Sequence, residues 1–192
     1  MLTESSGGAL KASGVTGPAP VGVLGIGGRT RNFAKALGHP VVAMNNREEG
    51  RTLAKELPLP ADRIIDYNDP EAVSKIKDWS GRDGLAAILG CTDNVEANAW
   101  CLNTLRPHGV CVPVGLPVDP GFMFSAFKLN FSELVIKGSL VATRNQVEDM
   151  MQVVAKHCIK GHVTTVTMEE AVNLPKMYLD SHLKGRLVVK LE

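Results

Sequence analysis

The segment Val21-Gly-Val-Leu-Gly-Ile26 runs directly into Gly27 and Gly28, and this junction decides the fold. A short, wholly apolar run that ends in glycines is typical of a strand buried on both faces. The segment Phe33–Leu37 then has helical character and stops at Gly38, a residue type that commonly ends helices. The junction therefore predicts a strand, a glycine turn and a helix in direct succession.

The same alternation continues along the chain. Further strands are expected at 40–44, 63–66, 85–89, 110–114 and 134–142, with helices at 48–57, 69–79 and 95–105. Apolar strands that alternate with helices specify a parallel sheet covered on both faces, joined by right-handed crossovers. The expected fold class is α/β, a doubly wound parallel sheet of the Rossmann-like type.

The two ends of the chain depart from this alternation. Residues 1–18 are rich in Gly, Ser, Ala and Pro and are expected to form a loose lead-in segment with a short helix at Ala9–Ser13. Residues 19–143 are expected to form the nucleotide-binding domain. Residues 144–192 are expected to form a short α+β extension, with a helix capped by Asn145 and strands at 162–168 and 186–190.

Composition excludes several classes of protein. The 192 residues carry 21 Lys and Arg against 20 Asp and Glu, so the chain lacks the excess of positive charge that binds nucleic acid or an anionic membrane. No apolar run is long enough to span a bilayer, and residues 1–8 lack the features of a signal peptide, so a cytoplasmic location is expected. The four cysteines and five histidines show no zinc-site spacing, and no catalytic constellation stands out. No metal is expected.

The glycine turn matches a dinucleotide-binding fingerprint in two of its three glycines. Gly25 permits the tight turn, and Gly27 allows a pyrophosphate to approach the backbone, but the third position is Thr30. Gly28 and Arg29 complete the candidate phosphate turn. Arg29 and the nearby Arg31 either supply charge to an anion or belong to a solvated surface, and the sequence leaves both readings open.

The end of the second expected strand indicates which dinucleotide would bind. An acidic residue there usually bonds the ribose 2′-hydroxyl of NAD. This chain has Asn45, Asn46 and Arg47 instead, and an arginine can pair with the 2′-phosphate of NADP. NADP(H) is therefore favoured over NAD(H), against the alternative of a solvated polar loop.

A further strand end adds candidate contacts. Cys91 and Thr92 follow the strand expected at 85–89 and are candidate cofactor contacts. Asp93 and Asn94 are expected to cap the next helix, with a polar contact to a ligand as the alternative.

Several motifs resemble the zinc-type, medium-chain alcohol dehydrogenases in order and spacing, from about Ala9 to the C-terminus. They are Val23-Leu-Gly-Ile-Gly-Gly28, Phe33-Ala-Lys-Ala-Leu-Gly38, Leu53-Ala-Lys-Glu-Leu57, Leu105-Arg-Pro-His-Gly109, Val114-Gly-Leu-Pro117, Lys137-Gly-Ser-Leu-Val-Ala-Thr-Arg144 and Leu183-Lys-Gly-Arg-Leu-Val-Val189. The resemblance implies the cofactor-binding half of that family. It also implies that Gly115 and Leu116 pass the nicotinamide, that Arg186 reaches the pyrophosphate, and that the 138–142 strand pairs with its twofold mate in a homodimer.

The chain also departs from that family. The N-terminal domain that holds catalytic zinc is expected to be missing, and the stretch between Gly28 and Phe33 is about three residues shorter than in the family, nearly one helical turn. Two functions stay open. One is an NADP(H)-binding, oxidoreductase-like protein with a small-molecule substrate. The other is a cofactor-poor remnant that serves as a cyclase or isomerase scaffold or as a regulatory partner of a full-length relative.

The expected C-terminal strands would have unpaired edges without a covering domain. We therefore expect self-association, another chain that covers these strands, or packing of the tail onto the sheet.

Overall fold

The computed structural model describes residues 2–25, 30–81, 83–116, 121, 123–180, 183 and 185–191, with side chains from residue 8 onward. Its centre is a six-stranded sheet in the order β3-β2-β1-β4-β5-β6, and every pairing is parallel. The strands are β1 (Val21–Leu24), β2 (Val41–Met44), β3 (Arg63–Ile65), β4 (Leu85–Gly90), β5 (Leu105–Pro113) and β6 (Val135–Ile136). This order is that of the doubly wound, Rossmann-like fold, so the predicted fold class is confirmed.

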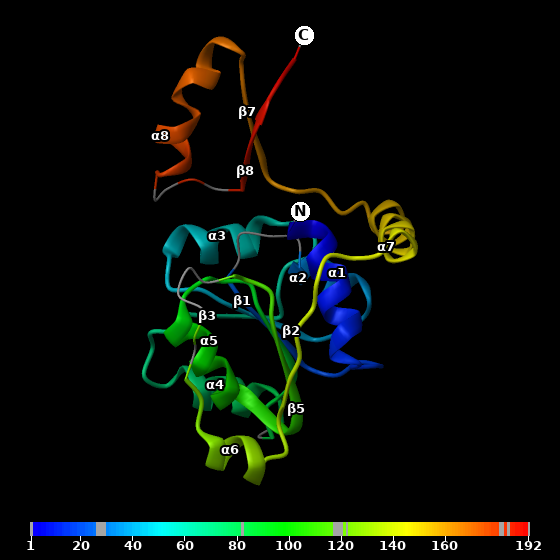
Figure 1. The fold of residues 1–192 in the computed structure, drawn as a ribbon, viewed down its shortest axis with the longest axis vertical. Coiled ribbons are helices and arrows are strands. Elements are labelled where there is room, and N and C mark those ends of the chain that lie inside the picture. The colour runs from blue at the N-terminus through cyan, green and yellow to red at the C-terminus, as the bar shows by residue number, and fades with distance from the viewer. Residues whose placement is uncertain are drawn as a thin grey trace.

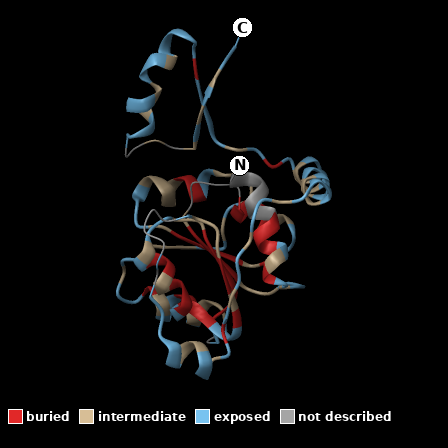
Figure 2. Ribbon diagram, in the orientation of Figure 1, coloured by how far each residue is buried: buried red, intermediate tan, exposed pale blue. Residues whose placement is uncertain are grey.

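Helices cover both faces of the sheet (Figure 1). They are α1 (Leu2–Ser13), α2 (Thr30–Ala36), α3 (Glu48–Glu56), α4 (Ala72–Trp79), α5 (Val95–Cys101), α6 (Ala126–Phe131), α7 (Arg144–Lys156) and α8 (Leu174–Tyr178). One apolar cluster joins Met44 and Ile88 of the sheet to Ile76 of α4. A second joins Val23 of the sheet to Leu10 of α1 and Ala34 of α2. The strands between these clusters are the most deeply buried part of the molecule (Figure 2).

The N-terminal segment is more ordered than its composition predicts. The residues expected to form a loose lead-in make the 12-residue helix α1, in which Ala9 and Leu10 are fully or almost fully buried. The helix contacts α2, α7 and β5. Packing of this apolar stripe overrides the weak helix propensity of its Gly and Ser residues, and the prediction of a loose segment was wrong.

The region after β4 also differs from expectation. The helix expected to reach Leu105 ends at Cys101 and continues as a short 3-10 helix, η1 (Leu102–Thr104), so Leu105 already belongs to β5. The strand expected at 134–142 is reduced to the two residues of β6, and helix α6 was not expected. Thr143, rather than Asn145, caps α7. Its side chain accepts from the Gln146 N–H at 3.4 Å, and the Gln146 side chain accepts from the Thr143 N–H at 2.8 Å.

The last residues form a separate small unit. Strands β7 (Val163–Val166) and β8 (Arg186–Val189) pair in parallel as a two-stranded sheet, connected by η2 (Glu169–Asn173) and α8. This unit stands apart from the six-stranded sheet in Figure 1 and is mostly exposed in Figure 2. The α+β extension is confirmed, and within the described residues its strands β7 and β8 pair with each other and not with the six-stranded sheet.

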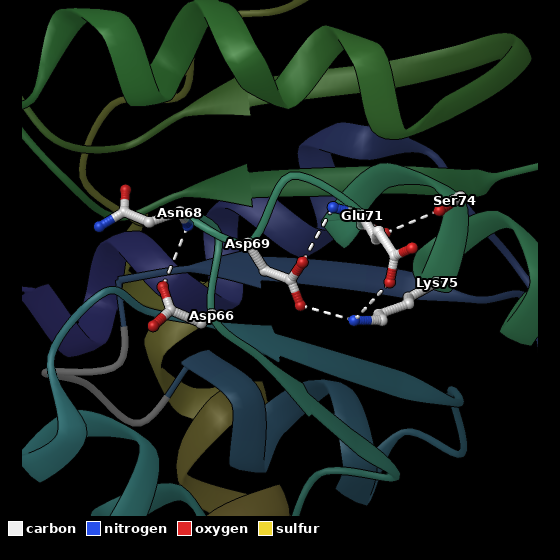
Figure 3. Close-up of polar contacts among 6 residues, drawn as sticks. All are labelled: Asp66, Asn68, Asp69, Glu71, Ser74 and Lys75. Carbon is white, nitrogen blue, oxygen red and sulfur yellow. Dashed lines mark hydrogen bonds and ion pairs between the residues drawn. The ribbon is translucent and has the colours of Figure 1, made fainter.

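A polar network fixes the turn between β3 and α4 (Figure 3). The Asp69 carboxylate accepts from the Glu71 N–H at 2.9 Å and from Lys75 Nζ at 2.7 Å. These bonds, that from Lys75 first, lower the pKa of Asp69. Asp69 thus orders the turn that precedes α4, whereas the helix expected from residue 69 begins only at Ala72, with Glu71 at its N-cap. Among the described helices, none is both long and apolar enough to cross a membrane.

Asp62 ties α2 to the sheet. Its carboxylate accepts from Lys35 Nζ at 2.8 Å and from the Val41 N–H at 2.6 Å. Burial raises the pKa of Asp62, but the hydrogen bonds from Lys35 and Val41 and the lysine charge outweigh burial, so the pKa lies below its usual value of 3.8. A depressed folded-state pKa stabilises the fold above the unfolded-state value, and this contribution is lost as the pH falls through the folded-state pKa.

We therefore expect Asp62→Asn to lower the free energy of unfolding by about 1 kcal/mol at pH 7. The difference from the native protein should shrink as the pH falls below 3.8, the ordinary value for this carboxyl. Urea unfolding at pH 7 and at lower pH measures both effects, with the exposed Glu56→Gln as control. A difference that stays constant with pH would show that the carboxylate charge is not involved.

Candidate functional site

A cleft of about 480 Å³ opens at the carboxyl ends of β1, β2 and β4. This is the position where the strand order reverses, between β1 and β4, and where open α/β sheets bind ligands. The volume lies within the range of small-molecule sites. The residues that line it are Leu24, Gly25, Asn45, Asn46, Arg47, Glu49, Gly50, Leu53, Tyr67, Cys91, Thr92, Asp93, Asn94, Leu183 and Gly185.

Close backbone contacts at two glycines shape this end of the sheet. Gly25 has φ +85°, and a β-carbon on it would lie 2.7 Å from the carbonyl oxygen of Cys91. A β-carbon on Gly115 would overlap the carbonyl group of Thr92. The Gly115 N–H also donates to the Gly90 carbonyl at 2.9 Å. Main-chain atoms that directly follow β1, β4 and β5 therefore meet here, with no room for a side chain at either glycine.

Thr30 occupies the position where the fingerprint expects a third glycine. The residue is 3% exposed, and its Oγ1 lies 3.5 Å from Sγ of Cys91. Burial raises the pKa of the Cys91 thiol and outweighs the opposite effect of the Thr30 hydroxyl. Thr30, the first residue of α2, thus packs against Cys91 just after β4, and it is not among the residues that line the cleft.

The loop after β2 is held by its own polar groups. The Asn45 Oδ1 accepts from the Arg47 N–H at 2.8 Å. Nη1 of Arg51 donates to the Asn45 carbonyl at 3.1 Å and to the Asp66 carboxylate at 2.7 Å. Arg51 is therefore committed to holding the loop. Arg47 lines the cleft, and its guanidinium makes no hydrogen bond or ion pair with another residue that the structure describes.

The opposite wall follows β4. The Asn94 side chain accepts from the Ala97 N–H at 2.7 Å, which confirms the predicted cap of α5. Nδ2 of Asn98 donates to the Thr92 carbonyl at 3.1 Å and fixes that residue against Gly115. Asp93 lines the cleft beside this cap.

The structure brings together five of the predicted site residues, namely Gly25, Asn45, Arg47, Cys91 and Thr92. Gly115 adjoins Thr92 without lining the cleft, and Leu116 is 89% exposed. Arg186 is exposed at the start of β8 and does not line the cleft, although Leu183 and Gly185 do. Gly27, Gly28 and Arg29 lie outside the described residues.

Sequence reasoning missed the far side of the cleft. Glu49, Gly50 and Leu53 come from the first turns of α3, and Tyr67 follows β3, with its ring 5.8 Å from that of Trp100. Tyr67 follows a parallel strand end, as Asn45 and Cys91 do, so the strand-end rule could have found it. Among the described residues, no group of three His, Cys, Asp or Glu side chains could hold a metal ion.

Together, the sheet order, the glycine turn and the position of the cleft define a dinucleotide-binding domain of the Rossmann-like class. The model of the zinc-binding dehydrogenase family matches residues 25–156, and the chain belongs to that family. The matched part corresponds to the cofactor-binding half of these enzymes, which implies a nicotinamide cofactor.

Known relatives agree with this assignment. An alcohol dehydrogenase of Geobacillus stearothermophilus is 30% identical over 187 residues, which cover 96% of this chain and 54% of that protein. The solved alcohol dehydrogenase of Aeropyrum pernix shares the fold, with a TM-score of 0.84 at 19% identity over 98% of this chain and 55% of that one. An acetophenone reductase of Geotrichum candidum, solved in complex with NAD, has a TM-score of 0.77 at 20% identity over 98% and 53% of the two chains. The chain spans about half the length of the curated relatives it matches.

Proposed function

We propose that the chain binds NADP(H) in this cleft and provides the cofactor-binding part of an oxidoreductase that acts on a small alcohol or carbonyl compound. The observation that carries the proposal is that Arg47 lines the cleft and that its guanidinium has no partner among the described residues. When bound, the cofactor would supply or accept a hydride. The residues of this chain would bind and orient it.

Charge at the end of β2 supports NADP(H) over NAD(H). Asn45 and Asn46 stand where NAD sites carry an acid, so no carboxylate repels a 2′-phosphate from this position. A phosphate would give Arg47 a charge-assisted hydrogen bond. Glu49 also lines the cleft, and it is the residue that would favour NAD(H) by accepting a ribose hydroxyl. Variants of Arg47 and Glu49 therefore test whether the cleft prefers NADP(H) or NAD(H).

We expect Arg47→Met to weaken NADPH binding by at least about tenfold and to leave NADH binding unchanged, because the lost hydrogen bonds involve a charged group. Calorimetric titration of both dinucleotides against the native protein and the variant measures this. Glu49→Gln is the matched control and should not weaken NADPH binding. Tighter binding of NADH than NADPH by the native protein would contradict the assignment to NADP(H).

A non-redox role is the second candidate, and Thr30 favours it because the fingerprint glycine is replaced at this position. The same titration decides between the two functions. If neither dinucleotide binds at millimolar concentration, the proposal fails and a role as a scaffold or regulatory partner is supported.

A further inference from the structure

Arg31, in the first turn of α2, is buried in an unusual way. The residue is 1% exposed, and its Nε, Nη1 and Nη2 atoms are sealed from solvent without a hydrogen-bond partner. The side-chain amide nitrogen and oxygen of the neighbouring Asn32 are also buried without a hydrogen-bond partner. Of the six buried side-chain nitrogen and oxygen atoms that lack a partner in the described part of the chain, five belong to these two consecutive residues. Buried polar groups are normally paired, so this concentration needs an explanation.

The guanidinium remains charged in this position. Burial lowers the pKa of Arg31 to about 10, which leaves the group protonated at neutral pH. No carboxylate of the described residues forms an ion pair with it. A buried charge without a partner destabilises a fold, so the ligand-free protein carries a cost that a bound anion would remove.

The place of Arg31 in the fold points to the anion. Residues 25 to 30 connect β1 to α2. At one end of this connection Gly25 lines the cleft, and at the other Thr30 touches Cys91, which also lines it. Arg31 follows directly. The reading of Arg31 as solvated surface is therefore wrong, and the residue follows in the chain directly after the segment that holds pyrophosphate in dinucleotide-binding folds.

We infer that Arg31, with Asn32, binds a phosphate group of the dinucleotide. These side chains would supply the hydrogen-bond donors that the backbone of an intact glycine fingerprint supplies in other dinucleotide-binding proteins. The inference rests on the proposed function and extends it to a second arginine with a different role. A guanidinium offers a planar fork of donors that matches phosphate oxygens, and the Asn32 amide adds two further donors. Because these groups are covered here, the surrounding side chains must shift to admit the anion, and we expect association slower than that of preformed sites.

The substitution Arg31→Met tests the inference because it keeps an unbranched apolar stem and removes the charge. The variant should weaken NADPH, NADH and inorganic pyrophosphate binding alike, by at least about tenfold. Without ligand, it should melt at a temperature at least about 2 °C higher than the native protein, since the unpaired charge is gone. Arg63→Met, which removes an exposed charge at the start of β3, is the control and should change neither property.

The comparison with Arg47 distinguishes this inference from the proposed function. Arg47→Met should affect NADPH alone, whereas Arg31→Met should affect every pyrophosphate-bearing ligand. If the variant is less stable without ligand and binds both dinucleotides as the native protein does, Arg31 is structural and the inference is wrong. If pyrophosphate binding depends on Arg31 but no dinucleotide binds, the anion site is supported and the proposed function fails.

A measurement on the native protein covers the case in which the variant does not fold. Inorganic pyrophosphate, added in chloride buffer, should raise the melting temperature of the native protein, because it binds only the folded state. The absence of any rise at millimolar pyrophosphate overturns the inference without a variant.

Discussion

Gly25→Ala is expected to lower the free energy of unfolding by about 3 kcal/mol and to abolish dinucleotide binding. Two costs combine at this position. A non-glycine residue at φ +85° carries about 1–2 kcal/mol of backbone strain, and the new β-carbon would lie 2.7 Å from the Cys91 carbonyl oxygen. Relief of that contact would displace Cys91, which lines the cleft.

The chain offers two controls that separate these costs. Gly38 has the same φ of +85° with nothing within 4 Å of an added β-carbon, so Gly38→Ala should show the strain alone, about 1 kcal/mol. Gly115 lies outside the left-handed region but faces the Thr92 carbonyl, so Gly115→Ala should show the steric cost alone, about 1–3 kcal/mol. Chemical denaturation gives all three values. Equal losses for Gly25→Ala and Gly38→Ala would show that the contact with Cys91 is relieved without effect.

We propose that the chain self-associates through its C-terminal unit, and sedimentation velocity should show species larger than a monomer. The parallel pairing places Val163, Thr165, Arg186 and Val188 on one face of the β7–β8 sheet, and all four are exposed. Parallel sheets are normally covered on both faces, and two strands alone are marginal in water. The same unit exposes Met168, Val172, Tyr178, Leu179 and Leu191. A second copy would cover this apolar surface.

Two sets of variants distinguish the C-terminal unit from the other proposed surface. The double substitution Val163→Lys and Val188→Lys should convert the assembly to monomers, because it places two further cations beside Arg186. The stretch 138–142 is exposed and contains Leu140, at 85% exposure, so Leu140→Lys should have no effect if β7 and β8 form the contact. If Leu140→Lys alone dissociates the assembly, the twofold seam at 138–142 is the interface. A native protein that sediments as a monomer would contradict both.

The elements that could be predicted from sequence are those whose signals are local. Apolar runs ending at Leu24, Met44 and Gly90 located the central strands, and Asn94 located the start of α5. Helix α1 could not be predicted because its stability comes from burial of Ala9 and Leu10 against distant elements. The strand expected at 134–142 is longer than the observed β6 for the opposite reason. Most of its residues are apolar, but only Val135 and Ile136 pair with a neighbouring strand.

The residues of the candidate site that could be predicted from sequence are likewise those with a local signal. Residues directly after parallel strands, such as Asn45 and Thr92, could be placed in the cleft because the carboxyl ends of parallel strands share one edge. Leu183 reaches the cleft from the end of the chain, a long-range approach that no local pattern signals. The burial of Arg31 could not be foreseen either, since a charged residue beside a loop is exposed in most proteins.

The contacts of Gly25 and Gly115 with Cys91 and Thr92 have a consequence for how this site can evolve. The shape of this edge of the sheet is set by peptide groups from three strands, and those groups stay the same whatever side chains are attached to Cys91 and Thr92. A substitution at Thr92 can therefore change the polarity of the cleft and leave this main-chain framework in place, whereas Cys91 is also constrained by the contact of its thiol with the buried Thr30. Selection on ligand preference and selection on folding act here on different atoms of the same residues.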